Sequence, residues 1–195
     1  MGNVRIGKKW PRKTIFFQVS RKVRELDTSG NVQRSINVWQ NNTSLRFVNA
    51  PAPNRIVFVF SVRSAATGRC SSHVGMRGGV QRIRCAPPFR VGGLMHEIGH
   101  AIGLYHEHQR RDRDRVVDVF RFSPAVDFAK KQPPWAMPVG PYDCASIMHY
   151  PRSRFQKVRM SRCATGSSRG PFTRTMGQRR APSNGDLAAV RFLYK

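Results

Sequence analysis

The sequence has no long apolar run. Its longest apolar stretches are short, such as residues 56–60, whereas a membrane-spanning helix needs about 20 apolar residues in a row. The first nine residues are polar and basic, without the apolar core of a secretory signal. We therefore expect no transmembrane segment and no signal peptide in this chain. A length of 195 residues suits one domain with a real hydrophobic core.

Acidic residues are scarce. The chain has 10 Asp and Glu against 35 Lys and Arg, which gives a net charge of +25. One interpretation is a negatively charged partner: nucleic acid, a glycosaminoglycan, an anionic membrane or an acidic peptide. The other is a compositional bias that spreads arginine over a solvated surface. We favour the second, because no basic run is long or interleaved with aromatic residues. In either case the field should attract anionic substrates.

Cysteine is sparse as well. The chain has four cysteines, which allow three pairings, and the residues alone leave the pairing open. Disulfide formation would indicate an oxidising compartment. Cys144 and Cys163 either pair with each other or stay free.

The regular elements are predicted mainly in the first half of the chain. Alternating or β-rich segments predict five strands, at residues 14–20, 45–49, 55–61, 70–75 and 79–85. Apolar residues at helical spacing predict a helix over 31–41 and a last helix in which Leu187, Val190 and Tyr194 share a face. A further helix is expected over 90–103, after Pro87 and Pro88, and a short one near 124–130. The rest of the second half is expected to be irregular.

One stretch concentrates the histidines and glutamates. Residues 96–107 read H-E-I-G-H-A-I-G-L-Y-H-E. Positions i and i+4 of a helix share a face, so His96 and His100 point toward one ion. Gly103 lets the chain leave the helix and return His106 as a third ligand. Three imidazoles leave one position of a tetrahedral Zn²⁺ open to water, as in catalytic zinc sites. Glu97 lies where it can reach that water.

The alternative is an ordinary helix with satisfied surface histidines. The inventory argues against it, because two of the three glutamates lie in this motif. Five of the six histidines fall at positions 96, 100, 106, 108 and 149. Random placement would not group them in this way.

A second motif follows at residues 146–150, S-I-M-H-Y. A methionine in a tight turn beneath a three-histidine site is typical of metzincins. With both motifs, the chain resembles the astacin family. The resemblance extends to residues 10–11, 14–19, 39–48, 70–75, 78–81, 106–114, 177–179 and 186–194, and so covers nearly the whole chain.

The resemblance implies roles for further residues. Tyr150 looks like the family's extra zinc ligand, a phenol that also helps to stabilise the tetrahedral intermediate. Met148 should pack beneath the zinc, and Glu107 resembles the glutamate that contacts the mature N-terminus. Cys70 and Cys85 should form a disulfide. The segment Gly78, Gly79, Val80 and Gln81 resembles an edge strand that pairs with an extended peptide, although an ordinary hairpin turn is equally consistent with it.

The resemblance also implies the architecture. We expect an α+β, metzincin-like fold in which an N-terminal mixed five-stranded sheet carries two long helices. The C-terminal half should be mostly irregular with one closing helix, and the active-site cleft should lie between the halves. The chain reads as a single catalytic domain, 1–195, with subdomains of about 1–103 and 104–195 and without the signal and propeptide usual in the family.

These observations predict a secreted, monomeric endopeptidase with one catalytic Zn²⁺ and a peptide or protein substrate. Glu97 would act as the general base. The alternative is an arginine-rich polyanion-binding protein with an inactive protease site. The intact motif argues against inactivity, whereas the charge supports polyanion binding.

Overall fold

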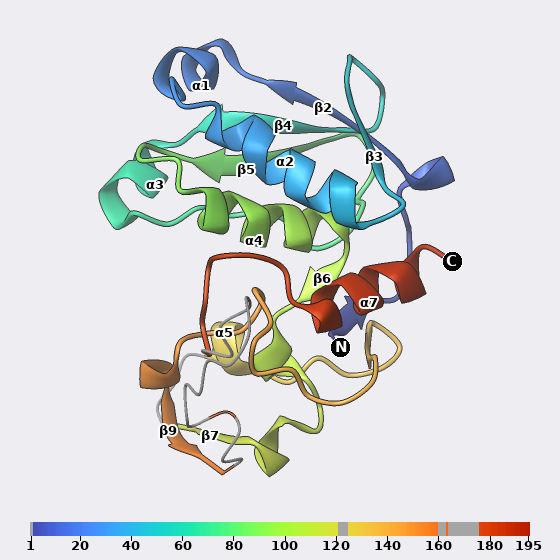
Figure 1. Cartoon of the computed structure of the whole chain (residues 1–195), viewed down its shortest axis with the longest axis vertical. Helices are drawn as coiled ribbons and strands as arrows, with labels where there is room; N and C mark the ends of the chain where they lie inside the picture. The colour runs from blue at the N-terminus through green and yellow to red at the C-terminus, as the bar shows by residue number, and fades with distance from the viewer. Residues whose placement is uncertain (1, 121–124, 160–162, 164–175) are drawn as a thin grey trace. The chain divides into compact units, whose positions relative to one another are not determined.

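The structure is a computed structural model that describes residues 2–120, 125–159, 163 and 176–195. It divides into two compact units (Figure 1). One comprises Gly7–Gly103 with Tyr194–Lys195, and the other Met1–Ile6 with Leu104–Leu193. The chain therefore begins in the unit of residues 104–193, passes through the unit of residues 7–103 and returns to its starting unit at Leu104.

The unit of residues 7–103 contains a parallel four-stranded sheet of order β3-β2-β4-β5. Its strands are β2 (Thr14–Val19), β3 (Arg46–Asn49), β4 (Arg55–Phe60) and β5 (Val80–Cys85). Parallel neighbours need crossover connections, and helices supply them between β2 and β3 and between β4 and β5. Along β2 and β4 the buried residues alternate: Ile15 and Phe17, then Ile56 and Phe58.

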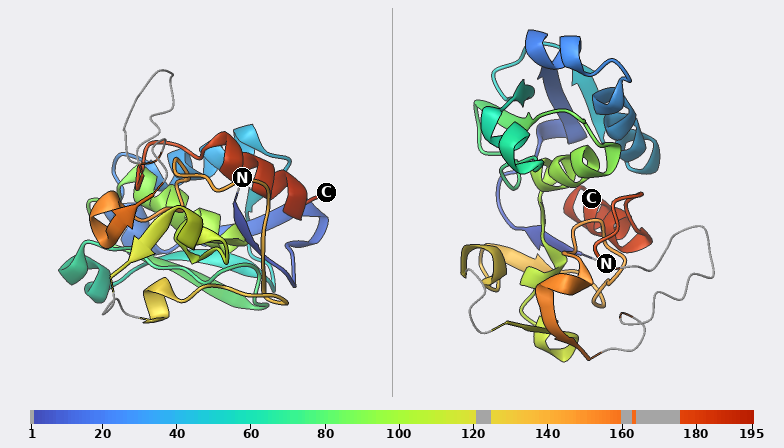
Figure 2. Two further views of the ribbon diagram at one scale, coloured as in Figure 1. Left: turned by 90° about the horizontal axis from the view of Figure 1, so that it is seen from below. Right: turned by 90° about the vertical axis from the view of Figure 1, so that its left-hand side faces the viewer.

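Four helices accompany this sheet: α1 (Arg21–Leu26), α2 (Asn31–Asn42), α3 (Val62–Thr67) and α4 (Val91–Ile102). Asp27 begins α2 by accepting from the backbone N–H groups of its first two residues, at 2.9 and 2.8 Å. Helices α2 and α4 lie together over one face of the sheet (Figure 2). The indole of Trp39, fully buried, donates to the Met95 carbonyl at 3.0 Å and so ties α2 to α4.

The prediction of a mixed five-stranded sheet is wrong. Residues 70–75 form no strand; only Ser71 makes an isolated antiparallel bridge, to Arg84. The segment is polar at Ser71, Ser72 and His73, and its last residue, Gly75, has a φ of +68°. A β-strand of this sheet would need alternating apolar side chains and an extended backbone. The segment lacks the first, and its last residue has a left-handed conformation instead of an extended one.

The other unit is less irregular than predicted. Strand β1 (Asn3–Arg5) is the centre of an antiparallel sheet of order β6-β1-β8, with β6 (Leu104–Tyr105) and β8 (Ala136–Pro138) at its sides. Strands β7 (Val117–Val119) and β9 (Phe155–Val158) form a second antiparallel pair. These strands are too short to show a period in the sequence, which is why the prediction omitted them.

In its described residues this unit includes α5 (Ala125–Phe128) and the closing helix α7 (Asn184–Leu193). The predicted helix near 124–130 is thus shorter, and its first residue lies outside the described part of the chain. Short 3-10 turns complete the elements at Pro11–Lys13, Glu107–Gln109, Arg113–Arg115 and Arg152–Arg154. Within the described residues, no helix combines the length and the apolar character that crossing a bilayer would demand.

The Trp39 contact predicts a large effect on stability. Replacing Trp39 with Ala should lower the free energy of unfolding by about 3–5 kcal/mol, because it leaves a cavity and removes the indole hydrogen bond between α2 and α4. Chemical denaturation measures this change. The matched control is Trp135→Ala, since Trp135 is 67% exposed and its loss should cost little. Equal effects of the two substitutions would contradict the packing described.

Candidate functional site

Helix α4 positions the first two histidines. The helix is buried on nearly all sides, with Leu94, Ile98 and Ile102 at or near zero exposure. His96 and His100 lie one turn apart, and their ring centroids are 4.7 Å apart with ring planes at 83°. Glu97 lies between them in sequence and is 7% exposed. The helical pitch therefore brings both imidazoles together in surroundings that exclude most water.

Gly103 ends this helix. Its φ of +116° is one that residues with a side chain rarely adopt, and its N–H donates to the carbonyls of Gly99 and His100. The indole of Trp10 and the phenol of Tyr194 donate to two further carbonyls at this end, those of residues 101 and 102, each at 2.9 Å. With the terminal carbonyls satisfied, the chain turns out of the helix into the extended strand β6.

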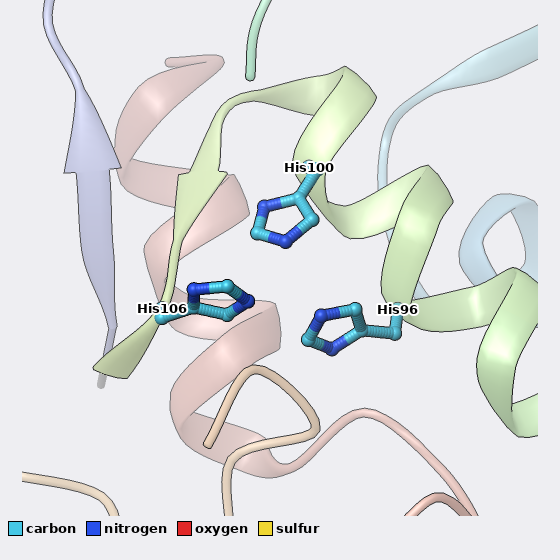
Figure 3. A group of neighbouring side chains, drawn as sticks. All are labelled: His96, His100 and His106. Atoms are coloured by element: carbon cyan, nitrogen blue, oxygen red, sulfur yellow. The ribbon is translucent and has the colours of Figure 1, made fainter. Parts of the chain in front are cut away.

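The chain then reaches His106 directly after β6. The three histidines of residues 96–106 each offer a ring nitrogen, and these atoms lie within 4.8 Å of one another. Figure 3 shows the rings pointing toward a common centre. This is the one group of three or more His, Cys, Asp or Glu side chains with metal-ligand geometry among the described residues. Zn²⁺ bound by three imidazoles at about 2.0–2.1 Å requires such convergence, so the donor set fits that ion.

Tyr150 lies beside the third histidine. Its ring centroid is 4.6 Å from that of His106 and 4.1 Å from that of His108. His108 is fully buried, and its Nε2 lies 3.0 Å from the Asp127 carbonyl. Phe128 packs edge-on against Tyr150 at 5.7 Å. The structure thus places the Tyr150 ring beside those of His106, His108 and Phe128. Zinc coordination by Tyr150 stays a prediction.

A tight turn at residues 146–149 carries Met148. The His149 N–H donates to the Ser146 carbonyl at 3.0 Å and closes the turn. Met148 is 1% exposed, and its carbonyl accepts from the Glu107 N–H at 3.1 Å. Because Glu107 directly follows His106, this bond fixes the turn to the backbone of the third histidine.

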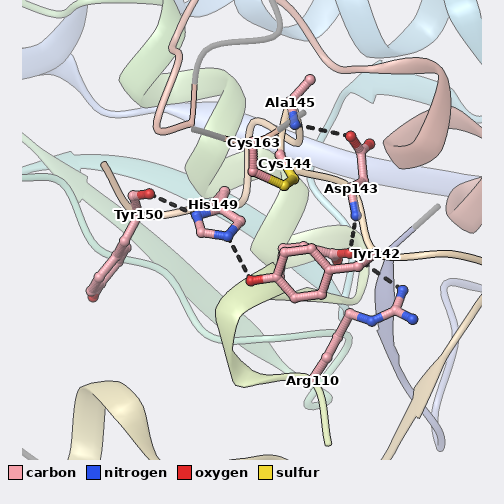
Figure 4. Close-up of a disulfide and its surroundings, with 9 residues drawn as sticks. Arg110, Tyr142, Asp143, Cys144, Ala145, His149, Tyr150 and Cys163 are labelled. Atoms are coloured by element: carbon pink, nitrogen blue, oxygen red, sulfur yellow. Dashed lines mark hydrogen bonds and ion pairs between the residues drawn. A yellow bond between two sulfur atoms is a disulfide. The ribbon is translucent and has the colours of Figure 1, made fainter. Parts of the chain in front are cut away.

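His149 supports the same turn from inside. Burial lowers its pKa to about 4, so the ring is neutral at pH 7. Its Nδ1 donates to the Tyr150 carbonyl at 2.7 Å, and its Nε2 accepts from the Tyr142 hydroxyl at 2.6 Å (Figure 4). These contacts give His149 a structural role.

Glu107 is enclosed completely. One carboxylate oxygen accepts from the Asp143 N–H at 2.8 Å and from Arg110 at 3.3 Å, whereas the other has no hydrogen-bond partner among the described residues. Burial raises the pKa of Glu107 well above its usual value, and the Arg110 guanidinium opposes this shift. The predicted contact of Glu107 with the N-terminus stays a prediction.

Asp186 is a supporting residue whose role the sequence did not predict. It lies in the first turn of α7 and exchanges hydrogen bonds with the N-cap residue Ser183, at 2.8 and 3.0 Å. Its carboxylate also accepts from the Ser146 hydroxyl at 2.6 Å and the Ile147 N–H at 2.8 Å. The second pair of partners lies about forty residues away, so no local sequence pattern indicates this contact.

The predicted substrate segment has structural contacts of its own. The Gly79 N–H donates to the Asn54 side chain at 2.7 Å, and its carbonyl accepts from the Arg55 N–H at 3.2 Å. Gln81 is buried, and its amide bonds the Gly75 carbonyl and the Arg77 N–H, each at 3.2 Å. Gly78 has a φ of +90° and Val80 is 42% exposed. Peptide binding by this segment stays a prediction.

Two disulfides are present. Cys70 pairs with Cys85 and joins β5 to the segment of the isolated bridge. Cys144 pairs with Cys163, directly before the Met148 turn (Figure 4). The second pair resolves the alternative that the sequence left open, and no free cysteine remains.

Comparison with solved structures identifies the fold as that of zinc proteases. The chain is similar to High choriolytic enzyme 1, a hatching enzyme zinc-protease from Oryzias latipes, with a TM-score of 0.70. The match has 23% identity and covers 96% of this chain and 92% of that chain, which bears on the fold alone. The profile of the peptidase family Astacin matches residues 2–195, and the chain therefore belongs to the astacin family of metalloendopeptidases.

The curated relatives that the chain resembles are consistent with this family assignment. The chain is 33% identical over 197 residues to Zinc metalloproteinase nas-39 of Caenorhabditis elegans and 30% identical over 201 residues to Nematocyst expressed protein 6 of Nematostella vectensis. Each match covers 95% of this chain. The chain spans 20% of the first relative and 65% of the second.

The environment of Asp186 predicts a pH dependence of stability. Burial raises its pKa to about 6, against about 3.9 in an unfolded chain. The folded state therefore binds more protons between these values, and the free energy of unfolding should fall as pH rises through this window. In the unaltered protein, this group should lower the free energy of unfolding by about 3 kcal/mol as the pH rises from about 4 to about 6. In Asp186→Asn this pH-dependent decrease should be absent.

Urea unfolding over this pH range measures the two curves. The lost hydrogen bonds of the variant add an offset that does not depend on pH, so the slope is the informative quantity. Asp118→Asn, outside this cluster, should keep the slope of the unaltered protein. Identical slopes with and without Asp186 would contradict the assignment.

Proposed function

We propose that this chain is a zinc-dependent endopeptidase that hydrolyses peptide bonds of extended polypeptides. The observation that carries the proposal is the convergence of three histidine nitrogens within 4.8 Å, next to Glu97, in a chain of the astacin family. We propose this activity and a polypeptide substrate for the whole protein. We also propose that its catalytic domain divides into two subdomains at about residue 103.

His96, His100 and His106 are the proposed ligands, and Tyr150 beside His106 is the proposed fourth protein donor. When bound, zinc lowers the pKa of a coordinated water toward neutrality and polarises a carbonyl. Glu97 then accepts the proton of the attacking water and delivers it to the leaving amine. Its position on α4 between the two histidines, largely shielded from solvent, supports this role.

Two further residues act on the site without moving a proton. After moving off the metal, the Tyr150 hydroxyl would donate a hydrogen bond to the oxygen that becomes negative during attack. Met148 would supply an apolar floor, which its 1% exposure and its link to Glu107 support.

The substrate would bind as an extended strand beside Gly78, Gly79, Val80 and Gln81. The cationic surface suits a substrate with an acidic residue after the cleaved bond, since the net charge is +25. Two disulfides support a secreted location. We propose a monomer.

A second candidate function is polyanion binding, which the excess of arginine favours. The version with an inactive protease site lacks support, because all the proposed ligands and Glu97 are present. Polyanion binding is therefore proposed in addition to peptidase activity.

The proposed ligands predict a loss of metal on substitution. His100→Ala should reduce zinc from about one ion per chain to nearly none, because two imidazoles hold the ion too weakly. Metal analysis after dialysis measures this. His73→Ala is the control, since His73 lies outside the cluster, and it should retain zinc. Full zinc in His100→Ala would contradict the ligand assignment.

The proposed base predicts a catalytic defect without loss of metal. Glu97→Gln should lower kcat on a quenched peptide by roughly 10²–10⁴-fold, because the amide cannot accept the proton. Zinc content should stay unchanged. Glu25→Gln, on the exposed surface of α1, should leave kcat unaltered. Unchanged turnover in Glu97→Gln would exclude it as the base.

A further inference from the structure

The four-stranded sheet has a second face that helices α2 and α4 do not cover. Along β5 the burial alternates strictly: Gln81, Ile83 and Cys85 are buried, whereas Val80, Arg82 and Arg84 are exposed. Figure 2 shows α2 and α4 on one side of the sheet only. We call the opposite side the outer sheet face.

Strand register assigns the other members of this face. Val57 is paired with Arg82 and Val59 with Arg84, so these side chains share the outer face. On the neighbouring strands the same face carries Thr14, Phe16, Gln18, Arg46, Val48 and Arg55. Phe16, Val57 and Val59 are half-buried, whereas Arg46 is exposed. The outer sheet face is thus an apolar strip with arginines along it.

Within residues 7–103, no carboxylate forms an ion pair with an arginine of the outer sheet face. These residues contain sixteen Lys and Arg but three acids, a net charge of +13. Glu25 pairs with Arg21, Asp27 caps α2, and Glu97 lies in α4. No ion pair joins an acid to an arginine of the outer sheet face in the part of the chain that the structure describes.

Arg55 lies inside the strip. One of its terminal nitrogens donates to the Ala52 carbonyl at 2.7 Å, and its Nε is buried without a hydrogen-bond partner among the described residues. A donor of this kind normally has an acceptor. Because this nitrogen is enclosed, a polyanion bound on the sheet would contact the exposed guanidinium groups of Arg82 and Arg84 instead.

The strands space the charges regularly. Residues two apart on a strand lie about 6.6 Å apart, which applies to Arg82 and Arg84, and neighbouring strands lie about 4.8 Å apart. With the order β3-β2-β4-β5, the edge strand that carries Arg46 lies about 14 Å from β5. The register places Arg46 about four residues further back along the sheet than Arg82, so these two residues lie about 20 Å apart. A flat array of this size matches several charged groups along one polymer rather than a single small anion.

We propose that the outer sheet face is a docking surface for a sulfated polysaccharide. The guanidinium groups supply paired donors for sulfate oxygens, and the apolar strip accommodates sugar rings. Single-stranded nucleic acid would require exposed aromatic rings for stacking. The only aromatic ring that the strand pairing assigns to this face is Phe16, which is half-buried. The two disulfides indicate an oxidising compartment, where such polysaccharides occur.

This proposal deepens the polyanion binding proposed above and does not depend on peptidase activity. Heparin is the probe, and binding to the whole chain is measured by titration at several salt concentrations. Arg82→Gln combined with Arg84→Gln should weaken binding roughly tenfold at low salt and reduce the slope of log affinity against log salt by roughly 1.5. Glu97→Gln should bind heparin like the unaltered protein, so a failed peptidase assignment does not affect the result.

The matched control removes two positive charges from the helices. Lys22 and Arg34 are exposed on α1 and α2, and their double replacement with Gln should change affinity less than about twofold if binding is local. Circular dichroism and the melting temperature show whether each variant is folded. An equal loss in both double variants would overturn the proposal, since the charge would then act diffusely. Absence of heparin binding, or tighter binding of single-stranded DNA, would overturn it as well.

Discussion

The site depends on the way helix α4 ends. The pitch of the helix aligns His96 with His100, but a third imidazole can join them only if the chain leaves the helix abruptly. Gly103 permits this with a φ of +116°, and its N–H caps the helix. A side chain at this position would strain the backbone, and His106 would follow the helix away from the other two rings. One left-handed residue therefore determines whether three donors converge.

Convergence also requires that the segment after the helix be held in place. Buried polar contacts serve this purpose: the Glu107 N–H binds the Met148 carbonyl, and Asp186 of α7 binds the same turn through Ser146 and Ile147. Removing solvent from Asp186 raises its pKa to about 6, so this support is obtained at a cost in stability at neutral pH. The unit thus favours a fixed turn over maximum stability, which is common at functional sites.

Local sequence patterns predicted the longer helices and strands of residues 7–103, because these elements are long enough to show a pattern. The period of 3.6 located α2 to within about a residue, and the start signal at Pro87 and Pro88 did the same for α4. Alternating or β-rich segments located β2, β4 and β5. The pairing of β1 with β6 and β8 was not predictable, because strands of two or three residues carry no period and pair across a hundred positions. Residues 70–75 were wrongly predicted to form a strand. In the structure only Ser71 is paired, by an isolated bridge to Arg84. At the site, His96, His100 and His106 followed from spacing. The contacts of Asp186 did not, because its partners are distant in sequence.

The proposed activity requires that His96, His100 and His106 bind one zinc ion. X-ray absorption at the zinc edge of the metal-loaded protein measures the neighbours of that ion. Nitrogen and oxygen neighbours at about 2.0–2.1 Å are expected, with the outer-shell scattering of three imidazole rings. Sulfur neighbours at about 2.3 Å, or fewer than three imidazoles, would contradict this ligand set.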